Sequence, residues 1–528
     1  MHEIVTLQFG QQSNFLGTHF WNTQESYFTY PPEEESPVNH DILFRPGVAP
    51  DGSETFTPRT LIYDLKGSFG SMRRVNALYE PENNDPQESN VWSSKPSVTH
   101  FSTPIKPSDY QTHLDSGLQP PPLTTSSVRY WSDYSRLYYH PKSLVQLSEF
   151  DVNDTLMPFE KWDVGMELFE KLEREVDLVD RDLRPFVEEC DNIQGLQIMT
   201  GVDDAWGGWA SGWLERLRDE YGKLSIWTWG LGDQGGNMEV LRDKRLQQIA
   251  NSARSLQVIG EQSSVYVPIS SAPFKAPPYL SMDHSSHWHR GALQAIALES
   301  MILPSRLRSS NSGNGTLQDL EETINSTGNR RIAKLQMSIA NPDLLEEKSN
   351  VKTAQAEKAG AKYRKLNGKS HDDDDDEELP EFDMDVFTID YKIDSRKAQK
   401  REHIFGRAET YRGEWDISKN SERDPHDRFS QRPAVQRYSA PLLFPVLDSF
   451  PSIFNVSSSF TTNHPKKLAV YAGLSTSTSV ANQIRTLDQI VRRMVNLEER
   501  ETLSNGLQGM AEEYDEGWDS GSDSDSDE

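Results

Sequence analysis

Between residues 163 and 269 the sequence alternates between helix-like and strand-like patterns, and this alternation constrains the fold more than any other feature. It opens with apolar residues that recur every three or four positions from Val164 to Phe186, a spacing that gives a long helix one apolar face. Strand and helix candidates then follow in turn, at 195–199, 209–221, 224–229, 238–256 and 264–269. Strands separated by helices predict a parallel sheet covered by helices on both faces, the doubly wound α/β class.

The N-terminal stretch "EIVTLQFGQQSNFLG" predicts one more strand, turn and helix. Apolar and polar residues alternate over 3–9, Gly10 closes the pattern, and a helix is expected over 11–22. A second strand at 59–65 runs into the glycine turn "KGSFGS". Glycine turns of this kind let backbone N–H groups approach a phosphate closely, so a nucleotide-type domain is expected.

The length of 528 residues allows two or three domains, whereas a hydrophobic fraction of 35% is low and indicates long polar inserts. We expect a doubly wound domain over 1–257, with an exposed insert at about 81–150. The aromatic stretch 128–147 in this insert is expected to pack, because aromatic clusters are usually buried. A smaller α/β domain with C-terminal helices is expected over 258–345 and 386–510.

Most of the net charge of −28 comes from two short segments that contain no Lys or Arg. Ten acidic residues lie in 372–385 and nine in 512–528. These runs predict a disordered acidic insert over 346–385 and an acidic tail over 511–528. Because no basic stripe is present to bind phosphates, nucleic acid is not expected as a direct partner, and a basic partner fits better.

The acidic tail also carries a modification pattern. Ser520, Ser522 and Ser524 each have an aspartate three residues later, which suits an acidophilic kinase. Phosphorylation would make this tail more negative.

Cysteine content and the N-terminus restrict the compartment. Cys190 is the only cysteine, which excludes intrachain disulfides and a cysteine-based zinc site and fits a reducing compartment. No run approaches the roughly 18 apolar residues of a spanning helix, so no membrane span is expected. Residues 1–44 contain no Lys or Arg, unlike an Arg-rich mitochondrial transit peptide. At an organelle, the protein is therefore expected on the cytosolic face.

Several segments resemble tubulin and occur in the same order as in tubulin. At the N-terminus the matching residues are Met1, Glu3, Ile4, Val5, Gln8, Gly10, Gln11, Asn14, Gly17, Phe20 and Trp21. Further on, the resembling segments are "PRTLIYDL", "CDNIQGLQI", "RDEY" and "LSTSTSVANQIRTLD". The insert before residue 128, the block "YWSDYSRLYYHP" and the tail "EEYDEGW" are similar to the Misato family in its fungal form. The chain is identified as a member of that tubulin-like family.

The resemblance to tubulin implies a nucleotide pocket, for which GTP or GDP is the candidate ligand. The residues at the corresponding positions are Gly10, Gln11, Gln12, Asn14, Asp64, Gly207, Gly208 and Asn251. Asn251 stands where tubulin has an asparagine that reads the base, whereas Lys66 replaces an acidic residue that helps to manage the metal. The alternative is that these residues form turns and caps that the fold needs. We favour this second interpretation, a vestigial pocket.

The strongest reason is the stretch "DDAWGGWASGW" at 203–213, which stands where tubulin has a turn made almost entirely of glycine. Asp203 and Asp204 would place two carboxylates near the phosphate oxygens, and Trp206 and Trp209 would fill the space. At a separation of about 4 Å, repulsion between like charges costs about 1 to 4 kcal/mol. Each inward-facing aspartate would therefore oppose a nucleotide.

Two other motifs are weighed against the tubulin resemblance. "GLGDQGG" at 230–236 follows a strand, as a dinucleotide-binding turn does, but no acidic residue follows about 20 positions later to bind a ribose. The cluster of Asp283, His284, His287 and His289 does not have the spacing of a familiar zinc site, and no metal is expected. No arrangement of Ser, His and Asp around a nucleophile elbow is present either.

The Misato resemblance implies a role in the distribution of mitochondria and the inheritance of mitochondrial DNA. We predict a non-catalytic tubulin-like scaffold, in the cytoplasm and peripherally on the mitochondrial surface. Its expected partners are proteins, with tubulin and the cytosolic chaperonin as candidates. The alternative is a GTP-binding cytoskeletal protein that acts in microtubule organisation.

Overall fold

The computed structural model describes residues 2–29, 35–48, 52–73, 78, 105–232, 242–273, 275–308, 315–339, 382–387, 402–413, 434–454, 467–493 and 497–515. Several sequence predictions lie outside these ranges: most of the acidic insert, residues 81–104, the second half of "GLGDQGG", and the tail serines Ser520, Ser522 and Ser524. Among the helices described, none combines the length and apolar character that a membrane crossing requires.

A six-stranded sheet forms the centre of the N-terminal part, in the order β5-β4-β1-β6-β7-β8. Its strands are β1 (Glu3–Phe9), β4 (Thr60–Lys66), β5 (Leu144–Asp151), β6 (Ile193–Gly201), β7 (Ser225–Gly232) and β8 (Val265–Ser270). All neighbouring pairs are parallel. The predicted doubly wound α/β class is therefore confirmed.

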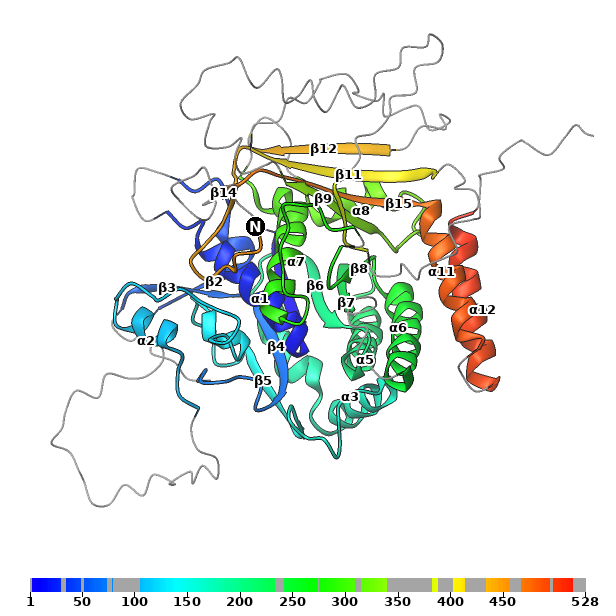
Figure 1. Ribbon diagram of the computed structural model, residues 1–528, viewed down its shortest axis with the longest axis horizontal. Helices are drawn as coiled ribbons and strands as arrows, with labels where there is room; N and C mark the ends of the chain where they lie inside the picture. Colours follow the sequence, from blue (N-terminus) through cyan, green and yellow to red (C-terminus); the bar gives the residue numbers. More distant parts are fainter. Residues whose placement is uncertain are drawn as a thin grey trace, which may run out of the picture.

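Helices cover both faces of this sheet (Figure 1). On one face lie α1 (Gly10–Glu25) and α7 (His287–Ile302); on the other lie α3 (Trp162–Val176), α5 (Ala205–Glu220) and α6 (Arg242–Gln262). The period of two in β1 explains the division: Ile4 packs into the cluster beneath α1 and α7, whereas Val5 and Leu7 pack into the cluster beneath α3 and α5.

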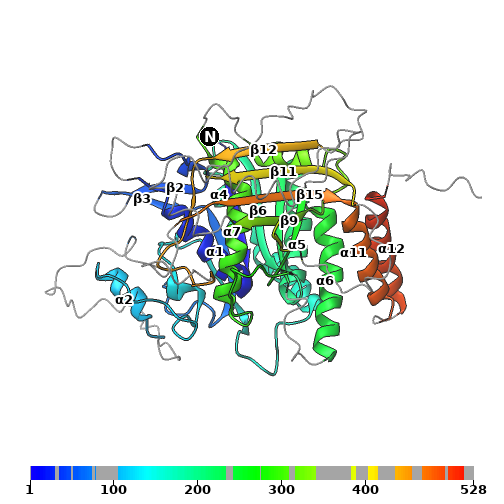
Figure 2. The same cartoon turned by 45° about the horizontal axis from the view of Figure 1, so that its top comes forward.

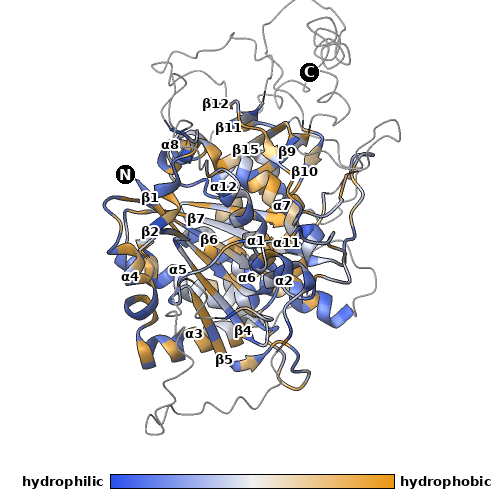
Figure 3. Cartoon of the chain, turned by 90° about the vertical axis from the view of Figure 1, so that its left-hand side faces the viewer, coloured by the Kyte–Doolittle hydropathy of each residue, from blue (hydrophilic) through white to orange (hydrophobic). Residues whose placement is uncertain are grey.

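A second sheet lies across α7 from the first, in the order β10-β9-β15-β11-β12. Its strands are β9 (Lys334–Ile339), β10 (Met384–Asp385), β11 (Ile404–Arg412), β12 (Ala434–Ala440) and β15 (Val470–Ser477), with α8 (Leu317–Ile324) packed on it. Since α7 is buried almost throughout and is coloured mostly hydrophobic in Figure 3, it serves as the shared core of both sheets.

Two C-terminal helices, α11 (Thr478–Val491) and α12 (Leu497–Glu513), lie side by side and pack against α6 (Figure 2). The C-terminal helices expected within 386–510 thus appear as α11 and α12. The remaining elements are short: β2 (Phe44–Val48), β3 (Glu54–Pro58), β13 (Phe444–Pro445), β14 (Lys467–Leu468), α2 (Asp109–Asp115), α4 (Arg184–Val187), three 3-10 turns (His40–Ile42, Trp131–Tyr134 and Leu303–Arg306) and a π-helical turn (Val179–Leu183).

The structure differs from the expected long helix over 163–186. Helix α3 ends at Val176, because Asp177 adopts a left-handed backbone conformation with φ of 47° that closes the helix. The chain continues through a π-helical turn and α4, and Leu183 and Phe186 remain buried. The apolar spacing thus identified buried residues correctly but not the break between the helical segments.

The structure also differs from the exposed insert expected at about 81–150. Trp131, Tyr134 and Tyr139 are each at most 2% exposed and belong to the main core, so the aromatic stretch packs as expected. Residues 144–151 form β5, an edge strand of the parallel sheet. The alternation over 144–151 is weak, and pairing with β4 makes this segment a strand.

A buried charged cluster joins the two sheets. Glu299 on α7 accepts hydrogen bonds from Arg306 and from Arg412 on β11, and all three side chains are fully buried. The hydroxyl of Tyr27 lies between them, 3.0 Å from Glu299 Oε1 and 2.8 Å from Arg412. One carboxylate thus pairs with two buried arginines, one from the turn after α7 and one from β11.

Candidate functional site

The place where a doubly wound sheet binds a ligand is the crevice at the carboxyl ends of the strands, where the strand order reverses. In this sheet the reversal falls between β1 and its neighbour β6. Strand β1 ends at Phe9 and leads directly into α1, and β6 ends at Gly201 and leads into α5. The predicted site residue Gly10 lies at this crevice, and so does Asp203, which was expected to oppose a nucleotide.

The crevice is filled by an aromatic side chain. The indole of Trp206 lies so close to Gly10 that a Cβ atom on that glycine would be 2.4 Å from Trp206 Nε1. Gly10 also has a positive φ of 83°, so glycine is required there both by the backbone and by the tryptophan. Phe159 covers the indole from the loop after β5, with ring centroids 5.1 Å apart. These two aromatic rings, Trp206 and Phe159, form what we call the aromatic plug.

Trp209, the second tryptophan expected to fill the pocket, lies elsewhere. It packs between the sheet and α3, against Tyr63 and Phe169. Its role is therefore in the core beneath α3.

The two aspartates stand at the start of α5. Asp204 caps this helix, because its Oδ1 accepts a hydrogen bond of 2.9 Å from the backbone N–H of Trp206. Burial, together with the neighbouring carboxylate of Asp203, raises the pKa of Asp204 to about 8. An additional anion such as a phosphate would meet unfavourable charge here.

Gly207 and Gly208 lie inside α5 and serve helix packing. A Cβ atom on Gly207 would be 2.2 Å from Ser255 Oγ on α6, and one on Gly208 would be 1.9 Å from the carbonyl oxygen of Trp162 on α3. The expected glycine turn is thus the first part of a helix that begins at Ala205. Both glycines permit close approach of helices, a role in the fold and not contact with a phosphate.

Asn14 and Asp64 meet each other beside the crevice. Asn14 Nδ2 donates to Asp64 Oδ2 over 2.7 Å, and Trp131 Nε1 donates to the same oxygen over 3.2 Å. Burial raises the pKa of Asp64 to about 6, against the opposing effect of these hydrogen bonds. Lys66, at the end of β4, is exposed, and its Nζ lies 4.0 Å from Asp151 Oδ2.

Asn251 is occupied by backbone groups. Its Nδ2 donates to the carbonyl oxygens of Glu160 and Asp203, over 2.7 Å and 3.0 Å, and its Oδ1 accepts from the N–H of Trp162 over 3.2 Å. The side chain is 3% exposed. Asn251 therefore ties α6 to the loops around the crevice, and no polar atom of its side chain remains for a base.

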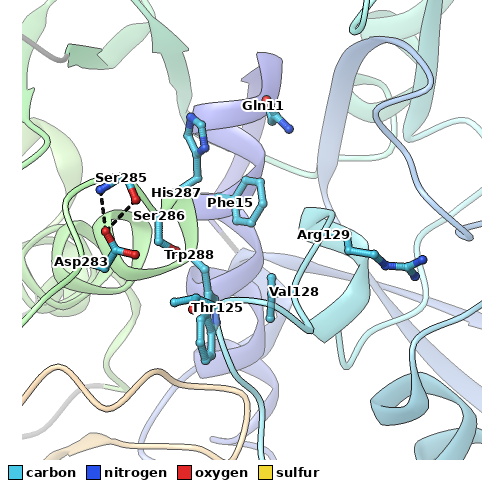
Figure 4. Close-up of a pocket in the computed structure, with 10 residues that line it drawn as sticks. All are labelled: Gln11, Phe15, Thr125, Val128, Arg129, Asp283, Ser285, Ser286, His287 and Trp288. Atoms are coloured by element: carbon cyan, nitrogen blue, oxygen red, sulfur yellow. Dashed lines mark hydrogen bonds between the residues drawn. The ribbon is translucent and has the colours of Figure 1, made fainter. Parts of the chain in front are cut away.

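A cavity of about 270 Å³ lies beside the crevice, between α1 and the start of α7 (Figure 4). Gln11 and Phe15 of α1 line one side, and Arg129 lines another. Phe15 stacks on His287 with ring centroids 5.5 Å apart, and burial lowers the pKa of His287 to about 4. The cavity is smaller than the roughly 300–1,000 Å³ of most small-molecule sites. Of the predicted site residues, Gln11 lines this cavity, and Gln12 is half-buried on the next position of α1.

The histidine cluster separates into different roles. Asp283 accepts hydrogen bonds from the backbone and hydroxyl of Ser285, and His289 Nδ1 accepts from the N–H of Asp283 over 3.1 Å. Within the part of the chain that the structure describes, no group of three or more His, Cys, Asp or Glu side chains is arranged to bind a metal ion.

Sequence reasoning missed three features of this region. Phe159 as the cover of Trp206, Arg129 as a wall of the cavity, and the buried Glu299 were not anticipated. Residues 156 and 157, next to Phe159, are exposed, and the loop that contains them has neither helical nor strand spacing. The sequence of this loop therefore gave no signal that Phe159 is buried. Only contacts between segments that are distant in sequence identify these residues.

Comparison with known proteins covers the whole chain. Residues 2–116 match the family model described as Misato Segment II tubulin-like domain, and residues 120–307 match the model of the tubulin domain. Protein DML1 of Phaeosphaeria nodorum is 68% identical over all of both chains, and Protein dml-1 of Neurospora crassa is 44% identical over 99% of each. Protein dml1 of Schizosaccharomyces pombe is 31% identical over 65% of this chain and 73% of its own length. Together with the six-stranded parallel sheet, these matches make the fold tubulin-like, as predicted.

Proposed function

The chain belongs to the Misato/DML1 family of tubulin-like proteins, and from this premise we propose that it is a non-catalytic scaffold that acts in the partitioning of mitochondria and the inheritance of mitochondrial DNA. The mitochondrial role rests on the family resemblance. Its proposed place is the cytoplasm and the cytosolic face of the mitochondrion, with tubulin and the cytosolic chaperonin as candidate protein partners.

The observation that carries the non-catalytic part of the proposal is the aromatic plug. Trp206 occupies the space against Gly10 where a phosphate would need the backbone N–H groups of the turn. Phe159 covers it, and the raised pKa of Asp204 reflects a site that is already unfavourable for negative charge. A nucleotide would have to displace an aromatic pair and then bind beside two carboxyl groups.

The alternative is a GTP-binding cytoskeletal protein, and a specific observation favours it. Asn14 Oδ1 is buried, and no donor in the described ranges bonds to it. A ligand donor or a buried water in this position would satisfy that oxygen. Since Gln11 and Gly10 adjoin it on α1, a nucleotide that binds after movement of the plug remains the competing model.

Calorimetric titration of the purified full-length protein with GTP and GDP separates the two models. We expect no binding by the wild type, and binding gained in the triple variant Asp203→Gly/Asp204→Gly/Trp206→Gly. Trp213→Ala is the matched control, because this tryptophan is also fully buried on α5 but packs toward Phe169, away from the crevice. Micromolar binding by the wild type would overturn the scaffold proposal.

The cellular role is tested by depletion of the family member in a fungus, followed by rescue with this chain. Loss of the protein is expected to fragment mitochondria or to deplete their DNA, visible by fluorescence microscopy and quantitative PCR. A Gln11→Ala variant should rescue fully if no nucleotide is needed. Normal mitochondrial networks and DNA content after complete loss would refute the mitochondrial role, whereas failure of Gln11→Ala alone would favour the GTP model.

A further inference from the structure

A run of consecutive prolines, residues 120–122, lies between α2 and the 3-10 turn Trp131–Tyr134. We call these residues the proline ridge. Pro122 is exposed, whereas Pro120 and Pro121 are half-buried. Helix α2, which precedes the ridge, lies at the edge of the molecule in two different views (Figures 1 and 2). The ridge therefore belongs to the surface of the protein.

The covalent structure of proline fixes the backbone of the ridge. The ring holds φ near about −65°, and the residue before a proline is kept out of the α-helical region. Gln119, Pro120 and Pro121 each precede a proline, so all of them are restricted to extended conformations. The chain here forms a short piece of polyproline II helix, which has about three residues per turn.

The N-terminal end of the ridge is held by the end of α2. Gly117, with a positive φ of 65°, donates from its backbone N–H to the carbonyl oxygen of Leu114 over 3.0 Å. The N–H of Leu118 donates to the carbonyl oxygen of His113 over 2.9 Å, which completes a Schellman cap. His113 Nδ1 also donates to the carbonyl oxygen of Gln119 over 3.1 Å. The chain that enters the ridge is thus fixed before any ligand binds.

The C-terminal end of the ridge is held by the core and by a turn. Leu123 packs against the main core, and the N–H of Thr124 donates to Ser127 Oγ over 2.8 Å. Because a polyproline II helix has about three residues per turn, Pro120 lies on the same side as Leu123, toward the core. Pro122 lies on another side, in agreement with its exposure.

Exposed apolar side chains flank the ridge. Leu118 is 59% exposed and Tyr138 is 43% exposed. Burial, together with the neighbouring carboxylate of Asp115, raises the pKa of Tyr138, so this ring lies beside the end of α2. Proline has no backbone N–H, and no donor in the described ranges bonds to the carbonyl oxygens of the ridge. A ligand that fits supplies apolar contact and hydrogen-bond donors together.

We propose that the proline ridge binds the aromatic groove of a WW-type domain in a partner protein. In such grooves, prolines pack on aromatic rings, and tryptophan and tyrosine side chains supply hydrogen-bond donors. A ridge that is already fixed loses little conformational entropy when it binds. The segment 118–125 contains adjacent prolines but no pair in the PxxP spacing, so it matches an SH3 domain less well.

Calorimetric titration of the full-length protein with a panel of purified WW domains tests the proposal, with SH3 and EVH1 domains titrated in parallel. At least one WW domain is expected to bind with a one-to-one stoichiometry and micromolar affinity. No binding by any WW domain would overturn the proposal, as would equal or tighter binding by an SH3 or EVH1 domain.

Proline variants locate the binding site. Pro121→Ala/Pro122→Ala should weaken binding of the WW domain by about tenfold or more, because the prolines are the contacts that the groove reads. Pro107→Ala is the matched control, since Pro107 is an exposed single proline just before α2, and it should leave the affinity unchanged. Equal affinities of the two variants would place the binding site elsewhere and overturn the proposal.

Hydrogen exchange of the wild-type protein gives a second measurement that does not depend on the stability of the variants. With the WW domain bound, amide exchange should slow within residues 116–127, at Leu118 and Leu123 among others. Slowed exchange only in other segments would contradict binding at the ridge.

Discussion

Substituting Gly208 by alanine tests whether the glycines of α5 are kept for helix packing. In the structure, α3 crosses α5 so closely that a Cβ atom at Gly208 would lie 1.9 Å from the carbonyl oxygen of Trp162 and 2.9 Å from the N–H nitrogen of Met166. Both obstacles are backbone atoms, so no side-chain rotation can relieve the contact. An ordinary contact begins at 3.4 Å, which means that α3 must move away by about 1.5 Å.

The expected cost follows from two opposing effects. Overpacking of a well-packed interior costs about 1 to 3 kcal/mol, with the upper end expected where backbone has to move. Alanine recovers up to about 1 kcal/mol through its better helix propensity. We therefore expect Gly208→Ala to lower the free energy of unfolding by about 2 kcal/mol. With an unfolding entropy of about 2.1 cal/mol/K per residue, this corresponds to a fall in Tm of about 2 °C for a chain of 528 residues.

Differential scanning calorimetry and urea unfolding of the ligand-free protein measure this effect. Gly509→Ala is the matched control, since Gly509 is exposed on α12 and a Cβ atom there would meet nothing within 4 Å. That control should gain about 0.5 to 1 kcal/mol from helix propensity alone. If Gly208→Ala unfolds at the wild-type temperature while Gly509→Ala is stabilised, helix packing is not the reason for the glycine, and the phosphate-turn interpretation regains support.

Three further predictions concern buried polar groups. The pKa of Asp204 is raised to about 8, so the folded chain retains a proton that the unfolded chain loses above about pH 4, and stability falls as the pH rises between these values. Asp204→Asn keeps the helix cap, so its urea midpoint should exceed that of the wild type at pH 8 and match it near pH 4; a constant difference would contradict this. Glu299→Gln leaves Arg306 and Arg412 buried without a counter-charge and should cost about 3 to 5 kcal/mol in thermal unfolding, whereas an unchanged Tm would show that the charge is dispensable. Asn251→Ala removes three hydrogen bonds to backbone and should lower the urea midpoint, at about 1 to 3 kcal/mol for each group left unpaired; a neutral effect would refute its tying role.

Much of the fold follows from patterns within short stretches of sequence. The alternation over 3–9 and the apolar spacing from Val164 predict β1 and α3, because strand and helix periodicities are properties of neighbouring residues. The ends of helices are harder to predict from such patterns. The break at Asp177 depends on one residue in a left-handed conformation, and the start of α5 at Ala205 depends on a cap formed by Asp204.

The candidate site was predicted only in part, because its structure depends on which residues distant in sequence come into contact. The sequence placed Gly10 and Trp206 in one pocket through the family resemblance. It did not indicate that Phe159 covers the indole, or that Gly207 and Gly208 face neighbouring helices. Asn251 lies near the crevice, as the tubulin resemblance implies, but its side chain forms hydrogen bonds only to backbone groups. The match of residue types to tubulin thus identified where the site lies, and the surrounding contacts determined what each of its residues does.

By itself, the sequence determined the order of strands and helices, the tubulin-like family and the uneven charge, because each is written in local periodicity, motif order or composition. Only the tertiary structure decided whether the crevice is open. That outcome depends on Trp206, which packs against a glycine almost two hundred residues earlier in the chain. The tertiary structure likewise decided that Glu299 pairs with arginines from two segments in the core. Such contacts arise from packing three-dimensional surfaces together, and no pattern within a single stretch encodes them.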